Sequence, residues 1–289
     1  SYLSLSILIV PSQYQSPSLI LPFTDTASFI RTVIRRMVST ELSPIEKAKR
    51  DAAFACAKKH VYPGCKLGVG SGSTVKYLVE YLEQAYKAGS LRDLICVPTS
   101  FMTKKWLVDS GLPVSDLDST PVLDVCIDGA DEVDADLTCI KGGGGCLARE
   151  KIVQHASKKF LVIADHTKEA VSLGDRYQFL PIEVLPFAAT PVSLEIPRLH
   201  GGTAGLRMAM KKAGPVITDN GSYIIDWVFP KQKKMDWKAI QAKLADTPGV
   251  VDTGLFIDVV DEVFFAYADG SVKSVSKNEK DTKKCSDSA

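Results

Sequence analysis

Residues 66–88 read KLGVGSGSTVKYLVEYLEQAYKA and contain one strand, one tight turn and one helix in succession. The apolar segment 66–70 predicts a short strand, and the turn at 71–74 opens a helix that we expect over 75–88. This order is typical of a βα unit, in which a strand of a parallel sheet is followed by a helix that covers the sheet.

The same alternation continues on both sides of this unit. A helix is predicted from Ser43 to about His60, because Ser43, Pro44 and Glu46 form a typical helix start. Strands are expected at 94–98, 122–127 and 160–164, with a helix at 101–110. The pattern predicts an α/β fold with a mostly parallel, Rossmann-like sheet that is buried on both faces.

The pattern changes after about residue 180. Strands are expected at 181–186, 207–210, 216–218 and 223–227, helices at 192–200 and 237–245, and a hairpin turn at 219–222. Segments 255–259 and 263–267 are predicted to return to the first sheet. We therefore expect an α/β catalytic domain over 43–180 plus 254–276, with a smaller α+β domain over 181–253 inserted near the C-terminus.

The two ends of the chain differ from the rest. Residues 1–36 are rich in Ser and Pro, hold a single acidic residue and carry three arginines near their end. This composition is typical of an organelle transit peptide, but an extension upstream of a true start at Met37 explains it equally well. Prolines interrupt its apolar run, so no membrane-spanning helix is predicted. We expect this leader to be disordered. A polar tail that begins near Lys273 is also expected to be disordered, and residues 277–289 of it are placed outside the folded domains.

The composition of the 289-residue chain narrows the classes of function. The net charge is +1 and no basic face stands out, which argues against a nucleic-acid partner. The seven cysteines lack regular spacing and CxxC pairs, which argues against a disulfide framework or a zinc site. Cysteines within apolar runs favour a reducing compartment, and we expect a cytoplasmic protein rather than one targeted to an organelle.

Four polar residues follow predicted strands directly: Ser71, Ser100, Asp128 and Asp165. In parallel sheets of this kind, ligands bind beyond the carboxyl ends of the strands. We therefore expect these four side chains to gather along one edge of the sheet, which is the predicted binding edge.

The first of these positions lies in the turn GVGSGST at 68–74. Glycines let the backbone approach an anion, and the helix N-terminus supplies free N–H groups. The turn lacks the third glycine of the dinucleotide fingerprint and the lysine of the Walker motif. A tight structural turn is the alternative, but the hydroxyls favour a phosphate site formed by Ser71, Gly72, Ser73 and Thr74.

Between 128 and 150 the sequence DGADEVDADLTCIKGGGGCLARE concentrates chemically useful side chains. Asp128 and Asp131 at the binding edge are candidates for acid/base chemistry, although a single Asp there could simply cap a turn. The neighbouring acids are interpreted as solvated or capping groups: Glu132, Asp134 and Asp136. A metal ion is the rival interpretation, but the spacing does not fit a calcium loop and the four histidines form no ligand pair. No metal site is therefore expected.

Four consecutive glycines follow Lys141 in the same segment. Such a run is entropically costly for a purely structural loop. We expect the main-chain amides of Gly142, Gly143 and Gly144 to bind an oxyanion. Lys141 would supply a fixed positive charge beside them. Glu150 falls near the first turn of the following helix, where on its own it could be a helix-dipole carboxylate.

Together these motifs resemble ribose-5-phosphate isomerase of the A type, in the form found in animals. The resemblance covers about 43–276 and rests on signatures in family order, namely GVGSGST (68–74), DGADE (128–132), KGGGG (141–145), REK (149–151), IADHTK (163–168), PIEVLPF (181–187), TDNG (218–221) and PGVVDTGLF (248–256). It implies interconversion of D-ribose 5-phosphate and D-ribulose 5-phosphate in the pentose phosphate pathway, without metal or another cofactor. It also implies a ferredoxin-like small domain and assembly as a homodimer or homotetramer.

The resemblance further implies roles for individual residues. Glu150 would move a proton between C1 and C2 through an enediolate, and Asp128 would assist ring opening. Lys141 and the glycine amides would stabilise the oxyanion, and Asp131 would hold substrate hydroxyls. The turn at 71–74 would bind near the phosphate, together with Lys168, which on its own is an ordinary surface lysine. A further cation comes from the first helix, where Lys49 is the candidate among Lys47, Lys49 and Arg50.

The sequence departs from the family pattern at two positions. Ser71 stands where many members have Thr. Cys146 stands where bacterial members have Ala, and it is interpreted as a small packed residue rather than a target of thiol-reactive inhibitors.

Two alternative functions are considered. A sugar-phosphate-sensing module of a transcription regulator can share the fold but would need a helix-turn-helix ahead of the sheet. An acyl-CoA transferase of related fold would use Glu150 as nucleophile, but the set of Asp128, Asp131 and Lys141 favours the isomerase.

Overall fold

The computed structural model describes residues 42–231 and 235–277. The expected leader at 1–36 lies outside these ranges, as does the tail from 278 onwards. From Ser43 the chain forms one compact unit. No helix in the described ranges has the length and apolar character needed to cross a lipid bilayer.

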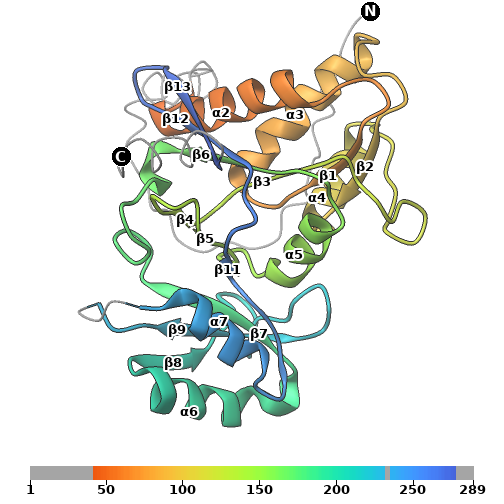
Figure 1. Cartoon of the computed structure of the whole chain (residues 1–289). Helices are drawn as coiled ribbons and strands as arrows, with labels where there is room; N and C mark the ends of the chain where they lie inside the picture. Colours follow the sequence, from red (N-terminus) through yellow and green to blue (C-terminus); the bar gives the residue numbers. More distant parts are fainter. Residues whose placement is uncertain (1–41, 232–234, 278–289) are drawn as a thin grey trace, which may run out of the picture. The chain divides into compact units, whose positions relative to one another are not determined.

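A six-stranded sheet forms the centre of this unit, in the order β13-β12-β6-β3-β1-β2. Its strands are β1 (Lys66–Val69), β2 (Ile95–Pro98), β3 (Val125–Asp128), β6 (Phe160–Asp165), β12 (Glu262–Ala266) and β13 (Val272–Ser276). All neighbours are parallel except β12 and β13. The expected α/β fold with a mostly parallel sheet is confirmed (Figure 1).

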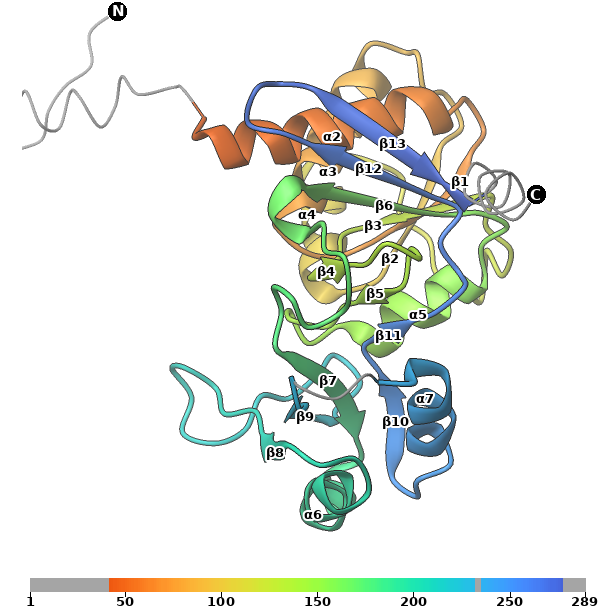
Figure 2. The ribbon, with the colours of Figure 1, turned by 60° about the vertical axis from the view of Figure 1, so that its left-hand side comes forward.

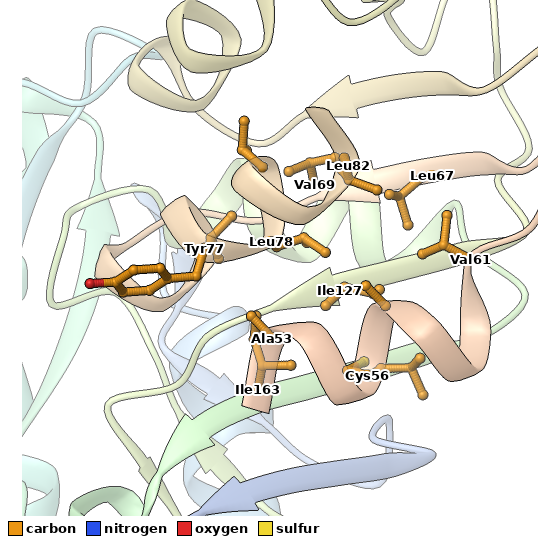
Figure 3. Packing of buried hydrophobic residues seen from close by; sticks show 14 of the residues in the cluster. Ala53, Cys56, Val61, Leu67, Val69, Tyr77, Leu78, Leu82, Ile127 and Ile163 are labelled. Carbon is orange, nitrogen blue, oxygen red and sulfur yellow. The ribbon is translucent and has the colours of Figure 1, made fainter. Parts of the chain in front are cut away.

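Helices cover both faces of this sheet (Figure 2). A hydrophobic core lies on each face. The first core lies between the sheet and α2 (Pro44–His60), α3 (Ser73–Lys87) and α4 (Phe101–Asp109), and the second lies between the sheet and α5 (Leu147–His155). As predicted, α2 begins after Ser43, whose Oγ accepts the Glu46 N–H at 3.2 Å. Figure 3 shows the first core, in which small side chains of α2 and larger ones of α3 pack on alternate residues of the strands: Ala53, Cys56, Leu78, Leu82, Leu67, Val69, Ile127 and Ile163.

A three-stranded sheet joins β4 (Glu132–Val133), β5 (Cys139–Ile140) and β11 (Leu255–Phe256). The expectation that 255–259 returns to the first sheet is wrong, because Leu255 and Phe256 pair with β5. The polar tail also begins later than expected, because Lys273 pairs with Phe265 within β13. That strand lies at the sheet edge with its first three residues exposed, so its sequence lacks an apolar period.

Residues 179–253 supply a four-stranded antiparallel sheet, in the order β10-β7-β9-β8. Its elements are β7 (Phe179–Val184), α6 (Ala189–His200), β8 (Thr203–Leu206), β9 (Tyr223–Val228), α7 (Trp237–Ala245) and β10 (Val250–Thr253), with Trp227 fully buried among them (Figures 1 and 2). The strands expected at 207–210 and 216–218 are wrong. Gly201 and Gly202 take φ of 80° and 76°, which ends α6 and turns the chain into a strand at 203–206.

Candidate active site

A cavity of about 330 Å³ opens where β1, β3 and β6 end. Most of the predicted site residues line it, namely Ser71, Gly72, Ser73, Thr74, Asp131, Lys141, Gly142, Gly143, Gly144, Glu150 and Lys168. The lining is completed by Ile45, Lys49, Gly129, Ala130, Asp165 and Thr167. Asp128 is fully buried behind this surface. The predicted binding edge of the sheet is therefore where the cavity lies.

The turn between β1 and α3 forms one side of the cavity. Gly72 is the N-cap of α3 with φ of 110°, so Ser73 and Thr74 lie in the first turn of that helix, whose free N–H groups suit an anion. The Ser71 N–H donates to Asp128 Oδ1 at 2.8 Å. A Cβ on Gly70 would lie 2.0 Å from that same oxygen, so a side chain at position 70 would displace Asp128.

Two lysines, Lys49 and Lys168, also line the cavity. The other two candidates of the first helix point elsewhere, because Arg50 pairs with Glu80 at 3.1 Å and Lys47 Nζ approaches Gly270. Of the three candidates on the first helix, Lys49 is therefore the one that lines the cavity. Lys49 is itself paired with Glu46 at 2.7 Å.

Three charged side chains are buried together beside the cavity. Lys141 Nζ lies 3.0 Å from Asp128 Oδ2 and 3.2 Å from Glu150 Oε2, and it donates to the Gly129 carbonyl oxygen. The exposed fractions are 0% for Asp128, 2% for Lys141 and 5% for Glu150. Two carboxylates thus share one ammonium, and the cluster carries excess negative charge when both are ionised.

Burial and this imbalance of charge change the proton affinities. Burial, followed by repulsion from Asp128, raises the pKa of Glu150 to about 8 against the attraction of Lys141. Burial also raises the pKa of Asp128. Burial lowers the pKa of Lys141, but the two carboxylates more than offset it, so this pKa ends above its ordinary value. A carboxyl that changes protonation near neutral pH beside a fixed cation suits proton transfer.

The glycine loop, residues 142–145, also contributes to the cavity, which Gly142, Gly143 and Gly144 line. Its Gly143 N–H donates to Asp131 Oδ2 at 2.7 Å. From the four-stranded sheet, Arg207 Nη1 donates to the carbonyl oxygens of Gly142 and Gly143, each at 3.0 Å. Arg207 is not among the residues predicted from the sequence, because its contacts with the loop join residues 64 and 65 positions apart and no local pattern marks them.

The other acids near the site have structural roles. Glu132 is fully buried, and its carboxylate accepts the N–H groups of Gly174, Arg176 and Tyr177 at 2.6, 2.7 and 3.3 Å. Its interpretation as a solvated group is wrong, whereas the capping alternative is correct. Asp134 Oδ1 caps the N–H groups of its own loop.

Cys146 is half-buried beside the glycine loop, with Sγ 3.7 Å from the Gly144 carbonyl oxygen. Burial raises the pKa of its thiol to about 12, so the thiol stays protonated and weakly nucleophilic. This agrees with a packed small residue. Across the described residues, no group of three or more His, Cys, Asp or Glu side chains is arranged to hold a metal ion.

One protein family matches the chain over residues 95–270, and it is described as ribose 5-phosphate isomerase A (phosphoriboisomerase A). A "Probable-ribose 5-phosphate isomerase" from Caenorhabditis elegans is 66% identical over 241 residues, which cover 83% of this chain and 96% of that relative. The ribose-5-phosphate isomerase of Homo sapiens is 47% identical over 237 residues, covering 82% of this chain and 75% of that protein.

Solved structures of ribose 5-phosphate isomerases are also similar to this chain. A D-ribose-5-phosphate isomerase in complex with phospho-erythronic acid superimposes with a TM-score of 0.76 at 36% identity, covering 80% of this chain and 99% of the other. The ribose 5-phosphate isomerase of Plasmodium falciparum also gives a TM-score of 0.76, at 32% identity, covering 81% of this chain and 99% of the other.

Proposed function

The chain belongs to the ribose 5-phosphate isomerase A family, and on this basis we propose how its cavity interconverts D-ribose 5-phosphate and D-ribulose 5-phosphate. The enzyme is an aldose–ketose isomerase of the pentose phosphate pathway. The observation that carries the assignment of roles is the buried cluster in which Asp128 and Glu150 flank Lys141 beside the cavity. The relatives do not favour a regulatory module or a CoA transferase.

The phosphate end of the substrate is assigned to the turn between β1 and α3. Ser73 and Thr74 lie in the first turn of α3, where amide N–H groups and the helix dipole favour an anion. Lys49 and Lys168 add two positive charges to the same lining. The sugar then extends toward Lys141 and Glu150, which place acid/base chemistry at the opposite end from the phosphate.

Ring opening is assigned to Lys141 with support from Asp128. The Asp128 carboxylate does not line the cavity, so it acts on the sugar through Lys141, whose ammonium it holds in the charged state. Lys141 gives a proton to the ring oxygen as the C1–O bond of the ring breaks, and it takes up the proton that the O1 hydroxyl loses as C1=O forms, so the ammonium is restored. Asp131, which lines the cavity, holds the hydroxyls of the open chain.

Proton transfer is assigned to Glu150. Its carboxylate removes the proton from C2 of the open aldose, and the electron pair forms the C1–C2 double bond of the enediolate. The same carboxyl returns its proton to C1, while the hydroxyl proton on O2 passes to O1, which gives the ketose. A positioned base contributes roughly 10²–10⁴-fold to the rate.

Stabilisation of the enediolate oxygen is assigned to Lys141 and the glycine loop. Negative charge develops on oxygen as C2 loses its proton, and donors fixed in a water-poor site favour that charge most strongly. One such donor is worth about 2.7–4 kcal/mol. Both groups line the cavity next to Glu150.

The test is conversion of ribose 5-phosphate by the purified chain with EDTA present, with ribose and other sugar phosphates as specificity controls. We expect the wild type to form ribulose 5-phosphate and Glu150→Gln to lose this activity. A wild type without conversion would contradict the function. A requirement for added metal would contradict the mechanism, and full activity in Glu150→Gln would contradict the choice of base.

Assembly as a homodimer or homotetramer and a cytoplasmic location are further proposals. The first is supported by the family resemblance. The second is supported by the free cysteines of the described residues, which fit a reducing compartment. Light scattering of the purified chain tests the first, where a monomer mass is the contrary result. Fractionation of cells that produce the tagged full chain tests the second, where recovery in an organelle is contrary.

A further inference from the structure

Arg207 connects the four-stranded sheet to the glycine loop. It follows β8 directly, and its Nε and Nη2 donate to Asp226 Oδ2 and Oδ1 on β9 at 2.7 and 2.5 Å. This two-point pairing fixes the plane of the guanidinium group, which leaves Nη1 directed at the loop. The side chain is only 14% exposed, so water competes weakly for these bonds.

The peptide bond between Gly142 and Gly143 is held from both sides. Its carbonyl oxygen accepts from Arg207 Nη1 at 3.0 Å, and its N–H donates to Asp131 Oδ2 at 2.7 Å. The C=O and N–H of a trans peptide point in opposite directions. Arg207 therefore lies on one side of the loop and Asp131 on the other, with the cavity on the side of Asp131.

The next peptide bond, between Gly143 and Gly144, is held only at its carbonyl end. Gly143 oxygen accepts from the same Nη1 at 3.0 Å, so the Gly144 N–H points away from Arg207. No acceptor for this N–H is found among the described residues, and Gly144 lines the cavity. Nothing lies within 4 Å of a Cβ built on Gly144, so packing does not fix this peptide.

We propose that Arg207 is a positioning residue for the isomerisation, which orients the Gly144 N–H toward the oxygen of the enediolate by holding two successive carbonyl groups. Arg207 does not line the cavity, so its proposed role involves no contact with the substrate. Glycine peptides reorient easily when such bonds are absent. The inference rests on the proposed function, because the amide has a catalytic role only when an oxyanion forms.

The test compares Arg207→Met with Arg176→Met. Arg176 also donates to a backbone carbonyl, that of Glu169 at 2.6 Å, but it is exposed and lies outside the cavity lining. We expect Arg207→Met to lower kcat by about 10–100-fold with little change in KM, because an oxyanion donor acts on the transition state. Arg176→Met should leave both constants close to wild type. Arg207→Lys, which keeps one charged donor, should recover part of kcat and serves if Arg207→Met fails to fold.

Hydrogen–deuterium exchange of the loop peptide, measured without substrate, gives a second readout that is independent of activity. We expect faster exchange of the loop amides in Arg207→Met but not in Arg176→Met. Unchanged kcat in Arg207→Met would overturn the proposal, and so would a lower kcat with unchanged loop exchange. If the wild type lacks isomerase activity but loop exchange still rises in Arg207→Met, the proposed function fails while the orientation of the loop by Arg207 stands.

Discussion

The ammonium of Lys141 lies 3.2 Å from Glu150 Oε2 in a place where both side chains are almost fully buried. The same ammonium lies 3.0 Å from Asp128 Oδ2. The charge of the proposed base is therefore linked to a single cation that has two partners. This link lets us predict how pH, and substitution of any of these three side chains, will affect catalysis and stability.

The pH dependence of catalysis reports the protonation of Glu150. Because the pKa of this carboxyl is raised to about 8, the free enzyme holds it mostly protonated at neutral pH, when it cannot act as a base. We expect kcat/KM to increase with pH and to level off above about 8. A profile that falls across this range would contradict the assignment, as would a profile that Glu150→Asp does not shift.

Glu150→Gln should change stability in a pH-dependent way. The folded-state pKa of Glu150 is about 8, above its ordinary value of 4.5, so the folded protein binds more protons here than the unfolded chain between these values. The free energy of unfolding of the wild type should therefore fall as pH rises through this window, by at most about 1.4 kcal/mol per pH unit. Glu150→Gln has no titratable group at this position, so its free energy of unfolding should not fall in this way. Thermal melts should show Tm of the variant gaining on the wild type from acidic to alkaline pH, and a constant difference would count against the raised pKa.

Lys141→Met should destabilise the fold as well as abolish turnover. It leaves two buried carboxyl groups without their cation, and loss of one partner from a buried ion pair costs about 3–5 kcal/mol. Adding Asp128→Asn to Lys141→Met removes one of those carboxylates. We expect the double variant to recover part of the free energy of unfolding in denaturant titrations without recovering activity. Strictly additive effects of the two changes would show that the pair is not coupled.

Two neighbouring glycines should respond differently to alanine. A Cβ on Gly143 would lie 2.6 Å from Asp131 Oδ1 and 2.9 Å from Tyr177 Oη, whereas a Cβ on Gly144 meets nothing within 4 Å. We expect Gly143→Ala to cost about 1–3 kcal/mol of stability, as overpacking does, and Gly144→Ala to melt close to the wild type. Equal Tm values for the two variants would contradict the close packing of Asp131 on the loop.

Much of the fold could be predicted from the sequence, because parallel strands and their helices leave clear local patterns. The capped start at Ser43 and the turn at 68–74 are examples that the structure confirms. The errors arose where pairing partners decide the structure. β11 is a two-residue strand that depends on β5, and β13 is an exposed edge strand without an apolar period.

The candidate site shows the same contrast between features set by local sequence and features set by contacts between distant residues. Residues within one turn or loop, such as Ser73, Thr74 and Gly144, could be found because their motifs are local. The burial of Asp128 behind Lys141 could not, because it depends on the space that Gly70 leaves open beside it. Arg207 reaches the loop from another sheet, and no local pattern marks such a contact.

The most direct test of the central claim, that Glu150 moves the proton between C2 and C1, uses ribose 5-phosphate deuterated at C2. Deuterium is followed by NMR, in solvent and at C1 of the product, during turnover by the wild type and by Glu150→Gln. We predict that the wild type removes deuterium from C2 and that Glu150→Gln does so at least about 10²-fold more slowly, the lower limit for a positioned base. Removal of deuterium from C2 by Glu150→Gln at the wild-type rate would contradict the claim.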